Sequence, residues 1–537
     1  MPVSSTPPSQ RKDRFVLAVT GNRWHGIALT CFAVAALLAV FSGTIADPDL
    51  WGHLRFGQDL LRTGQVIRPD PYSYMTGDQM WINHEWLAEG IFALTYRAAG
   101  SQGLIGLKLL AALSICGLIY ACLRDLHLAP LRAWVLVLLG TIPIYLGLAT
   151  VRPHLFTYVC FALLLFMLWQ AERGRTRWLW GLPLLFLLWP NLHGGFLAGV
   201  GILLLWLLVS LLELVLRRGG PLAASRPAPQ VRPALRTALT AVALALLATL
   251  VTPYGIGLWT FLLRTATIPR PEITEWAPLP LISLPGGVYL LLLLVGIAGF
   301  ALSRQQRRPF AILAFAVLAI LPMVAGRHLP LFAVAMPFLA GACVAEVWER
   351  WSASRRSARG DAGSHPIFRP VLTGVFVVGT VVLLVTGSSR ARCITVADKI
   401  YPVQAVALLR AARAEGAMAV DFDWGEYVIW HLGPTVRVSL DGRRETVYSE
   451  PRYQEGLNFM YGWKEWDAVL RRDGVEMALA KTQRAAYNLL KQQKAWDLVY
   501  EDPVSALFVK QPSPLAERLR AAAPPEPLPQ AGRLCFP

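Results

Sequence analysis

Long apolar segments recur along most of the chain. A helix needs about 20 mostly apolar residues to cross the hydrocarbon core of a bilayer, and eleven segments approach that length. They lie near residues 25–45, 102–123, 132–150, 154–171, 177–192, 195–216, 235–252, 286–303, 309–326, 330–348 and 369–387. Charged residues make up only 16% of the chain, against roughly a quarter in soluble proteins. The sequence therefore predicts a polytopic α-helical membrane protein with eleven transmembrane helices.

The net charge of +17 is unevenly distributed between the connections. If the N-terminus is cytoplasmic, nearly every basic cluster outside the C-terminal region falls on the cytoplasmic side, as the positive-inside rule requires. These clusters lie in residues 11–23, 124–132, 173–177, 217–236, 304–308 and 350–369. The charge thus orients the chain in a membrane, and we expect no nucleic-acid partner. The first apolar run is too long for a cleavable signal peptide and lacks a cleavage site, so we expect a retained anchor.

Three parts follow from this pattern. Residues 1–24 form a loose cytoplasmic N-terminal tail, residues 25–387 the transmembrane domain, and residues 388–537 a domain outside the cytoplasm. The connections 217–236 and 349–368 are rich in Ala, Pro, Arg or Ser and are expected to be linkers.

The last part has soluble composition and alternates helix with strand, which indicates a small α/β domain with a partly parallel sheet. We predict helices at 402–414, 463–472 and 482–494, strands at 417–422, 436–440, 476–480, 496–501 and 505–510, and an irregular tail of twenty residues. Cys393 and Cys535 both fall in this part and can form a disulfide in an oxidising compartment.

The first large outer loop spans residues 46–101. Asp47 suits the N-cap of a helix with Pro48 at its first position, since proline lacks the amide hydrogen that would be unpaired there. This helix should reach Arg62. Residues 68–74 are too rich in proline for a helix, and Asn83 can cap a second helix over 84–99. Both helices are expected to lie against the bilayer surface.

Asp47 and Asp49 are the first candidates for chemistry. Helix capping needs only one carboxylate, which leaves the other as a general base or both as ligands of a divalent cation, Mg²⁺ or Mn²⁺. On a helix, Asp49 and His53 are four residues apart and share a face, so the carboxylate can orient the imidazole. Arg55 follows on the same helix. The alternative for both aspartates is a capping role.

A second polar cluster is Trp81-Ile82-Asn83-His84-Glu85-Trp86. Glu85 can position an acceptor, and His84 can contact a phosphate. The alternative for both is a solvated first helical turn after Asn83. Trp81 can stack on a sugar, although an aromatic belt at the membrane interface explains it equally simply.

Basic residues at the outer helix ends form a third set. The positive-inside rule gives no reason for cations there, and charges at membrane depth mark function. Together they can hold a phosphate or pyrophosphate, whereas singly they can snorkel to lipid headgroups. The set is Lys108, Arg152, His154, His193, Arg327 and His328. The apolar segments contain almost no carboxylates, which argues against a proton- or ion-coupled transporter.

The arrangement resembles the membrane glycosyltransferases of the GT-C class, which include protein O-mannosyltransferases, aminoarabinose transferases and oligosaccharyltransferases. The specific resemblance covers residues 30–125: Asp47-Pro48-Asp49 follows the first helix, and residues 60–66, Trp81 and residues 100–108 come after it in order. The motifs at 152–154, 189–195 and 441–443 are similar to those of bacterial membrane proteins of this kind. Two features differ: Asp-Pro-Asp replaces an acidic-Glu pair, and Asn83-His84-Glu85 stands near the place of a Lys-Pro-Pro type motif.

The resemblance implies a hexosyl- or pentosyltransferase of the bacterial inner membrane, with its C-terminal domain in the periplasm. It would move a sugar from a polyprenyl-phosphate carrier to a glycan, lipid or protein of the cell envelope. Its catalytic residues would be Asp49, Asp47, His53 and Glu85, and its substrate-binding residues Arg55, His84, Lys108, Arg152, His154, His193, Arg327 and Trp81. No cofactor is required, although some members of the class use a divalent cation. Two alternatives remain: a non-catalytic scaffold of polysaccharide assembly, and a flippase of lipid-linked sugars.

Overall fold

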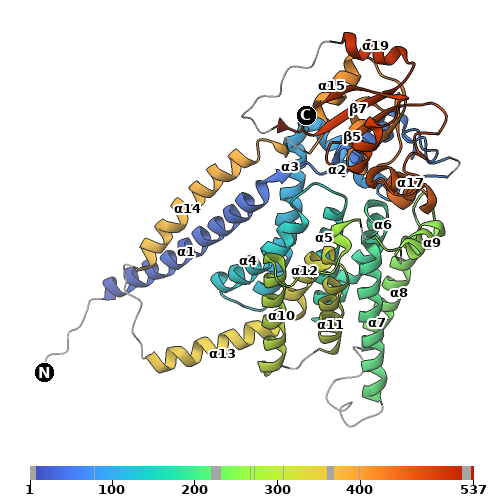
Figure 1. Cartoon of the computed structure of the whole chain (residues 1–537). Coiled ribbons are helices and arrows are strands. Elements are labelled where there is room, and N and C mark those ends of the chain that lie inside the picture. Colours follow the sequence, from blue (N-terminus) through green and yellow to red (C-terminus); the bar gives the residue numbers. More distant parts are fainter. Residues whose placement is uncertain are drawn as a thin grey trace.

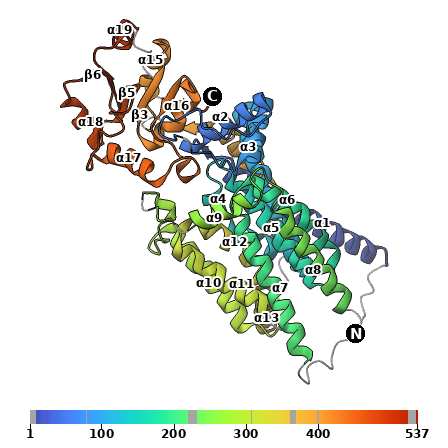
Figure 2. The same ribbon diagram turned by 90° about the vertical axis from the view of Figure 1, so that its right-hand side faces the viewer.

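A bundle of helices carries a domain of mixed helix and strand at one end (Figures 1 and 2). The computed structural model describes residues 8–77, 79–218, 231–266, 268–270, 272–305, 308–359, 368–397, 400–522 and 534–537. The small domain sits on the same end of the bundle as the outer loop helix α2 (Pro48–Thr63).

Apolar helices occupy all eleven predicted positions. They are α1 (Pro8–Ser42), α3 (Trp86–Asp125), α4 (Pro130–Gly147), α5 (His154–Glu172), α6 (Leu182–Leu192), α7 (Phe196–Arg218), α8 (Val231–Ala248), α10 (Leu284–Leu302), α11 (Pro309–Val324), α12 (Leu329–Leu339) with α13 (Gly341–Arg359), and α14 (Phe368–Arg390). Among the described residues, seven helices are long and apolar enough to cross a membrane, or eight if the bent α12–α13 pair is one span. The chain is a multi-pass membrane protein, and the count of eleven spans stays a prediction.

Three expectations about the helix ends are wrong. The tail predicted as loose over residues 1–24 is helical from Pro8, because α1 begins there. The predicted linker 349–368 is helical as far as Arg359, as part of α13. The helices predicted at 84–99 and 102–123 are one element, α3, which bends at Ala99 and Gly100. Gly100 has φ 57° and ψ −149°, a conformation that a residue with a Cβ avoids. The centre of the other predicted linker, 219–230, lies outside the described residues.

Ion pairs gather the predicted cytoplasmic connections at one end of the bundle. Arg173 pairs with Asp125 at 2.8 Å, and Arg308 pairs with Glu172. These pairs join the ends of α3 and α5 to the segment before α11. Three of the six basic segments on which the predicted orientation depends, 124–132, 173–177 and 304–308, therefore lie together in space.

The C-terminal domain is built on a five-stranded sheet of order β4-β3-β5-β7-β6. The strands are β3 (Gly416–Val420), β4 (Val436–Val438), β5 (Val475–Lys481), β6 (Trp496–Glu501) and β7 (Ser505–Lys510), and the helices α15 (Val403–Ala411), α16 (Gly425–Leu432), α17 (Glu450–Tyr461), α18 (Ala485–Lys491) and α19 (Pro514–Ala521). β4 and β5 run parallel to β3, whereas β7 runs antiparallel to β5 and β6. The expected partly parallel sheet is present.

Helix prediction in this domain was less successful. Residues 463–472 are turns rather than a helix, because α17 ends at Gly462 in the left-handed conformation. The helices α16 and α17 were missed. Six of the eight residues of α16 are buried, so its sequence lacks the polar face that reveals an amphipathic helix. Within the predicted irregular tail, residues up to 521 belong to α19, and residues 523–533 lie outside the described part.

A second, small sheet ties the C-terminal tail to the membrane domain. It joins β1 (Thr44–Ile45), β2 (Ile394–Val396) and β8 (Leu534–Cys535) in the order β1-β2-β8. Cys393 and Cys535 form a disulfide beside it. The next residue, Phe536, packs on Trp51 of α2 with ring centroids 4.2 Å apart. The tail therefore closes over α2, the helix that follows the Asp47-Pro48-Asp49 motif.

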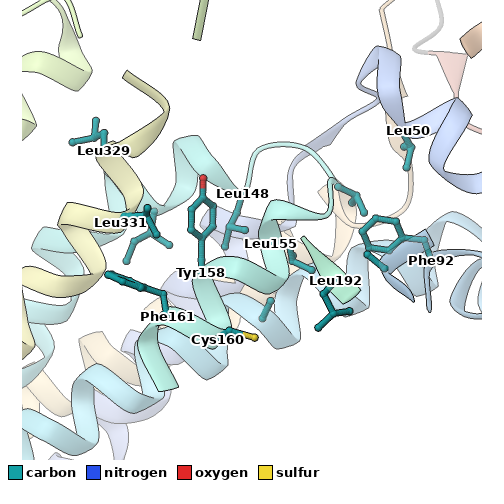
Figure 3. Close-up of a cluster of buried hydrophobic side chains, with 14 of the residues drawn as sticks. Leu50, Phe92, Leu148, Leu155, Tyr158, Cys160, Phe161, Leu192, Leu329 and Leu331 are labelled. Atoms are coloured by element: carbon teal, nitrogen blue, oxygen red, sulfur yellow. The ribbon is translucent and has the colours of Figure 1, made fainter. Parts of the chain in front are cut away.

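An apolar core lies beneath this junction (Figure 3). Leu50 of α2, Phe92 of α3 and Leu155 of α5 are fully buried, and Phe161 and Leu329 continue the core toward α12. Burial of side chains of this size contributes about 1.5–3 kcal/mol each. This core holds α2, α3 and α5 together, so the polar residues at their ends converge.

Candidate active site

The helix α2 begins as its sequence predicts. Asp47 is its N-cap and accepts a hydrogen bond from the backbone N–H of Asp49 at 3.0 Å, with Pro48 at the first position. Gly64, at φ 68°, ends the helix. A Cβ on Gly57 would overlap the backbone of Glu89, so α2 and α3 pack in direct contact there. This contact fixes the direction of Asp49.

Arg152 joins three carboxylates from two parts of the chain. Its Nη2 lies 2.6 Å from Oδ1 of Asp47 and 3.2 Å from Oδ2 of Asp49, and its Nη1 lies 3.5 Å from Oε2 of Glu275. Arg327 approaches the other oxygen of Glu275 at 3.5 Å. We call these five residues the Arg152 cluster. The exposed fraction of the side chain rises from 11% at Asp47 to 41% at Glu275, so the cluster opens on the Glu275 side.

Glu275 is a member that sequence reasoning missed. It lies on a short 3-10 helix (Thr274–Trp276) in the proline-rich outer loop, some two hundred residues from Asp49 along the chain. Its neighbour Trp276 packs against the guanidinium of Arg327 at 4.4 Å. The loop's acidic content was visible in the sequence, but nothing local indicated that it reaches Arg152.

The surroundings of Asp49 shift the pKa of its carboxyl toward neutral pH. Burial raises the pKa of its carboxyl to about 6, a shift that the guanidinium of Arg152 opposes and the carboxylate of Asp47 increases. Burial alone would lower the pKa of Arg152, but the carboxylates of Asp49, Asp47 and Glu275 outweigh it and raise that pKa. Arg152 therefore stays charged, while Asp49 changes protonation close to neutral pH.

His53 is oriented by Glu89 and not by Asp49. Its Nδ1 lies 3.2 Å from Oε1 of Glu89, whose other oxygen accepts a hydrogen bond from the Asn83 amide at 2.6 Å. Burial lowers the pKa of His53, but the hydrogen bond to Glu89 and the nearby carboxylates outweigh it and raise the pKa. The predicted Asp49–His53 pair is thus corrected. Asn83 also accepts from the N–H of Glu85, so α3 begins at Trp86 rather than at residue 84.

A chain of hydrogen bonds orients His193. Trp189 Nε1 donates to the Thr157 hydroxyl at 2.9 Å, and this hydroxyl lies 2.9 Å from Nδ1 of His193. The backbone N–H of Gly195 also donates to Nδ1. Because Nδ1 accepts that bond, the ring proton of the neutral imidazole is on Nε2, which lies 3.6 Å from Oε1 of Glu85.

Two further imidazoles lie beside it. Nε2 of His84 is 3.7 Å from the same oxygen of Glu85, and its buried Nδ1 has no hydrogen-bond partner. Nε2 of His154 donates to the carbonyl of Gly147 at 2.6 Å, and its ring centroid is 6.4 Å from that of His193. The structure thus brings His84, Glu85, His154 and His193 together at the outer ends of α3, α5 and α6.

Four predicted residues take other places. Lys108 is fully buried and donates to the carbonyl of Gly43 at 2.8 Å. Arg55 pairs with Asp59 at 2.9 Å within α2. Trp81 is only 3% exposed, because it packs against the guanidinium of Arg443 and does not belong to an aromatic belt at the membrane interface. His328 lies beside Arg327, but none of the described contacts joins its imidazole to those of His84, His154 and His193.

An aromatic cage surrounds Arg443, which belongs to the C-terminal domain. Its Nη1 lies 2.7 Å from Asp70 of the outer loop, and its Nη2 lies 2.7 Å from Asp441. Three rings stack around the guanidinium, at 4.8–5.4 Å: Phe56, Tyr72 and Trp81. We call these six residues the Arg443 clamp. It fastens the C-terminal domain to the first outer loop.

The side chains of Asp47 and Asp49 do not form the predicted divalent-cation site. Arg152 occupies the space between Asp47 and Asp49. Within the described residues, no three His, Cys, Asp or Glu side chains are placed to hold a metal ion. The divalent cation stays a prediction.

Comparison with solved structures identifies the fold. The archaeal oligosaccharyltransferase AglB from Archaeoglobus fulgidus, in complex with an inhibitory peptide and a dolichol-phosphate, matches with a TM-score of 0.52 at 13% identity, over 84% of this chain and 69% of that one. ArnT from Cupriavidus metallidurans, bound to undecaprenyl phosphate, matches with a TM-score of 0.49 at 13% identity, over 90% of this chain and 97% of that one. No protein-family model and no curated sequence matches.

The chain has a GT-C-type fold. The predicted resemblance to the GT-C class is therefore confirmed as a structural resemblance. At this level of identity the comparison supports the fold, and the roles of individual residues depend on the geometry described above.

Proposed function

We propose that this protein is a membrane glycosyltransferase that moves a sugar from a polyprenyl-phosphate carrier to an acceptor hydroxyl or amine on the periplasmic face. The observation that carries the proposal is the Arg152 cluster. It holds a carboxyl with a pKa of about 6 against the guanidinium of Arg152, while Arg327 binds Glu275 on the open side, at the end of the bundle where the C-terminal domain sits. A base beside cations is what this transfer requires.

Asp49 is the proposed base. Asp47 already accepts the capping N–H and the shorter bond from Arg152, whereas Asp49 is 30% exposed and reaches the open side of the cluster. In the proposed reaction the acceptor oxygen or nitrogen bonds to the anomeric carbon. The bond from that carbon to the carrier phosphate breaks, its electron pair leaves with the phosphate, and the acceptor proton moves to Asp49.

Arg152 and Arg327 are the proposed phosphate ligands. Both share Glu275, and that carboxylate is 41% exposed with contacts of only 3.5 Å. A carrier phosphate can replace such weakly held contacts with shorter, charge-assisted hydrogen bonds. His84 and His193 supply further donors beside Glu85.

The lipid part of the carrier needs an apolar surface near these donors. A shallow depression of about 510 Å³ on the outer face of α9 (Ile256–Thr265) is lined by Ile256, Trp259, Thr260, Leu263 and Arg264. On the same helix, Phe261 lies 6.1 Å from the ring of His84. We propose that the polyprenyl chain lies along α9 and directs its phosphate toward the histidines.

The test uses the purified full-length protein in lipid nanodiscs. Synthetic undecaprenyl-phosphate hexoses and pentoses serve as donors, and membranes of a strain lacking the protein supply the acceptor. Release of undecaprenyl phosphate is measured by mass spectrometry. We expect release by the wild type and a loss of about 10²–10⁴-fold in Asp49→Asn, the usual range for a general base. Asp467→Asn, which removes a carboxylate on the C-terminal domain that is 34% exposed and paired with Arg471, is the matched control.

Other outcomes separate the alternatives. Flipping of an intact donor across proteoliposomes, without release, would identify a flippase. A cell-envelope phenotype that is fully rescued by the double variant Asp47→Asn, Asp49→Asn would identify a scaffold. Either result rejects the transferase.

A further inference from the structure

A carboxyl group of the C-terminal domain reaches the acidic motif of the membrane domain. Glu426 lies in the first turn of α16 and is only 4% exposed. Its Oε2 is buried without a hydrogen-bond partner. A buried carboxyl without partners costs free energy unless a bound group completes it. This makes Glu426 an unusual side chain that the fold alone does not explain.

Three glycines allow Glu426 to occupy this place. A Cβ on Gly425 would overlap the carbonyl of Leu440, so α16 begins directly against the segment that follows β4. A Cβ on Gly52 of α2 would overlap the carboxyl of Glu426 itself. The two helices therefore meet at a point where only a hydrogen atom separates the α2 backbone from this carboxyl.

Gly442 shows how close Glu426 is to the proposed base. The position that a Cβ on Gly442 would occupy is 2.5 Å from Oδ1 of Asp49 and 2.9 Å from Oε1 of Glu426. Oδ1 of Asp49 and Oε1 of Glu426 thus lie against the same face of Gly442, and a larger residue there would collide with both. Arg152 binds the other oxygen of Asp49, so the oxygen that faces Glu426 is the one left for a substrate.

Burial raises the pKa of Glu426 well above its usual value, and the negative charges of Asp49 and Asp441 raise it further, while Arg443 opposes them. Burial raises the pKa of Asp49 to about 6. The surroundings of Glu426 therefore favour its protonated form, which can donate a hydrogen bond, whereas ionised Asp49 accepts one, a division of roles that acid–base sites use.

We propose that Glu426 is a substrate-binding residue of the transferase, supplied by the C-terminal domain, which holds the acceptor's reacting or neighbouring hydroxyl beside Asp49. The role rests on the proposed function. A neutral carboxyl donates one hydrogen bond and accepts another, as a hydroxyl group does, so the two are complementary. The C-terminal domain then closes the acceptor side of the site, opposite the cations that hold the phosphate.

The test compares Glu426→Gln with Glu426→Ala, in the full-length protein in nanodiscs and in the release assay above. Glutamine also donates and accepts without a charge, so we expect near wild-type rates. Alanine removes the hydrogen bonds, and we expect the acceptor concentration for half-maximal rate to rise about tenfold with a smaller change in maximal rate. Glu415→Gln and Glu415→Ala, at an exposed position of the same domain, are the matched controls. Undecaprenyl phosphate binding should be unchanged in all four variants.

Infrared difference spectra provide a readout that does not need turnover. Glu426→Gln should remove one protonated-carboxyl band from the wild-type spectrum at neutral pH. Loss of activity in Glu426→Gln equal to that in Glu426→Ala, or a wild-type acceptor dependence in Glu426→Ala, would overturn the role while the transferase stands. A retained infrared band would also overturn it. A wild type without release, or an active Asp49→Asn, rejects the proposed function and this role with it.

Discussion

Two arginines in this protein are held by carboxylates, yet their surroundings are opposite. Arg443 has a side chain only 5% exposed, and its partners Asp70 and Asp441 are fully buried. Its guanidinium donates four hydrogen bonds to these two carboxylates at 2.7–3.2 Å. Arg152 is 21% exposed and divides its contacts among three carboxylates at distances up to 3.5 Å.

This difference distinguishes a structural contact between two domains from a site that can bind a substrate. Arg443 has its charge neutralised and its donors used, so the clamp has nothing left to offer a ligand. The Arg152 cluster has long contacts to Glu275, an open side and a carboxyl whose pKa is about 6. Strong, saturated pairs fix the domain, whereas weak, shared pairs can exchange one partner for a substrate. The predictions below test this distinction.

The largest expected effect is a loss of stability when the Arg443 clamp is broken. Arg443→Ala leaves Asp70 and Asp441 buried without a counter-charge, which typically costs about 3–5 kcal/mol. We expect a large fall in the thermal unfolding midpoint of the purified chain and rapid proteolysis between the two domains. Arg437→Ala, at an exposed position on β4, should change neither. An unchanged midpoint in Arg443→Ala would show that the clamp does not fix the domain.

The second-largest expected effect is a loss of turnover when the Arg152 cluster is changed. Asp49→Asn should slow release by about 10²–10⁴-fold and leave the unfolding midpoint close to that of the wild type, because the side chain is partly exposed and its burial opposes its charge. The two variants should therefore have opposite signatures in the same pair of measurements. A large loss of stability in Asp49→Asn would place Asp49 with the structural residues.

The sequence predicted the local parts of this site well. The cap at Asp47 and the helix predicted as far as Arg62 follow from short-range rules, since turn chemistry acts over a few residues, and both are confirmed. The functional roles of Asp49, Arg152 and Arg327 stay predictions. The disulfide partners were also identified, because few cysteines lie in the polar part of the chain.

The long-range parts could not be predicted in the same way. Trp81 has the sequence context of an interfacial tryptophan, and only the fold shows that Arg443, more than three hundred residues later, stacks on it. Glu275 reaches the site through tertiary packing of a loop that lies far from Asp49 along the chain. The Asp49–His53 pair was predicted from helical spacing, but Glu89 of a neighbouring helix binds the imidazole instead.

A smaller effect concerns the pH dependence of transfer. Asp49 must be ionised to accept a proton, and its pKa is about 6. We expect the rate to be constant above that pH and to fall about tenfold for each pH unit below it. Residual turnover in Asp49→Asn should lack this limb. The same limb persisting in Asp49→Asn would assign it to another group, such as His53, whose pKa is raised.

The smallest effect tests whether the weak pairs are exchangeable. Glu275→Gln removes the carboxylate that Arg152 and Arg327 share, and partly exposed pairs of this kind are worth about 0.2–1 kcal/mol. If a phosphate competes with Glu275 for these guanidinium groups, its affinity should rise by roughly that amount, about 1.4- to fivefold, when the competitor is gone.

Binding of undecaprenyl phosphate to protein in nanodiscs measures this change, and Glu349→Gln, which removes a carboxylate paired with Arg132 at the other end of the bundle, is the control. Weaker binding in Glu275→Gln would mean that the carboxylate holds both arginines in place rather than competing for them. The Arg152 cluster would then be a second clamp, and the contrast with Arg443 would be one of strength alone.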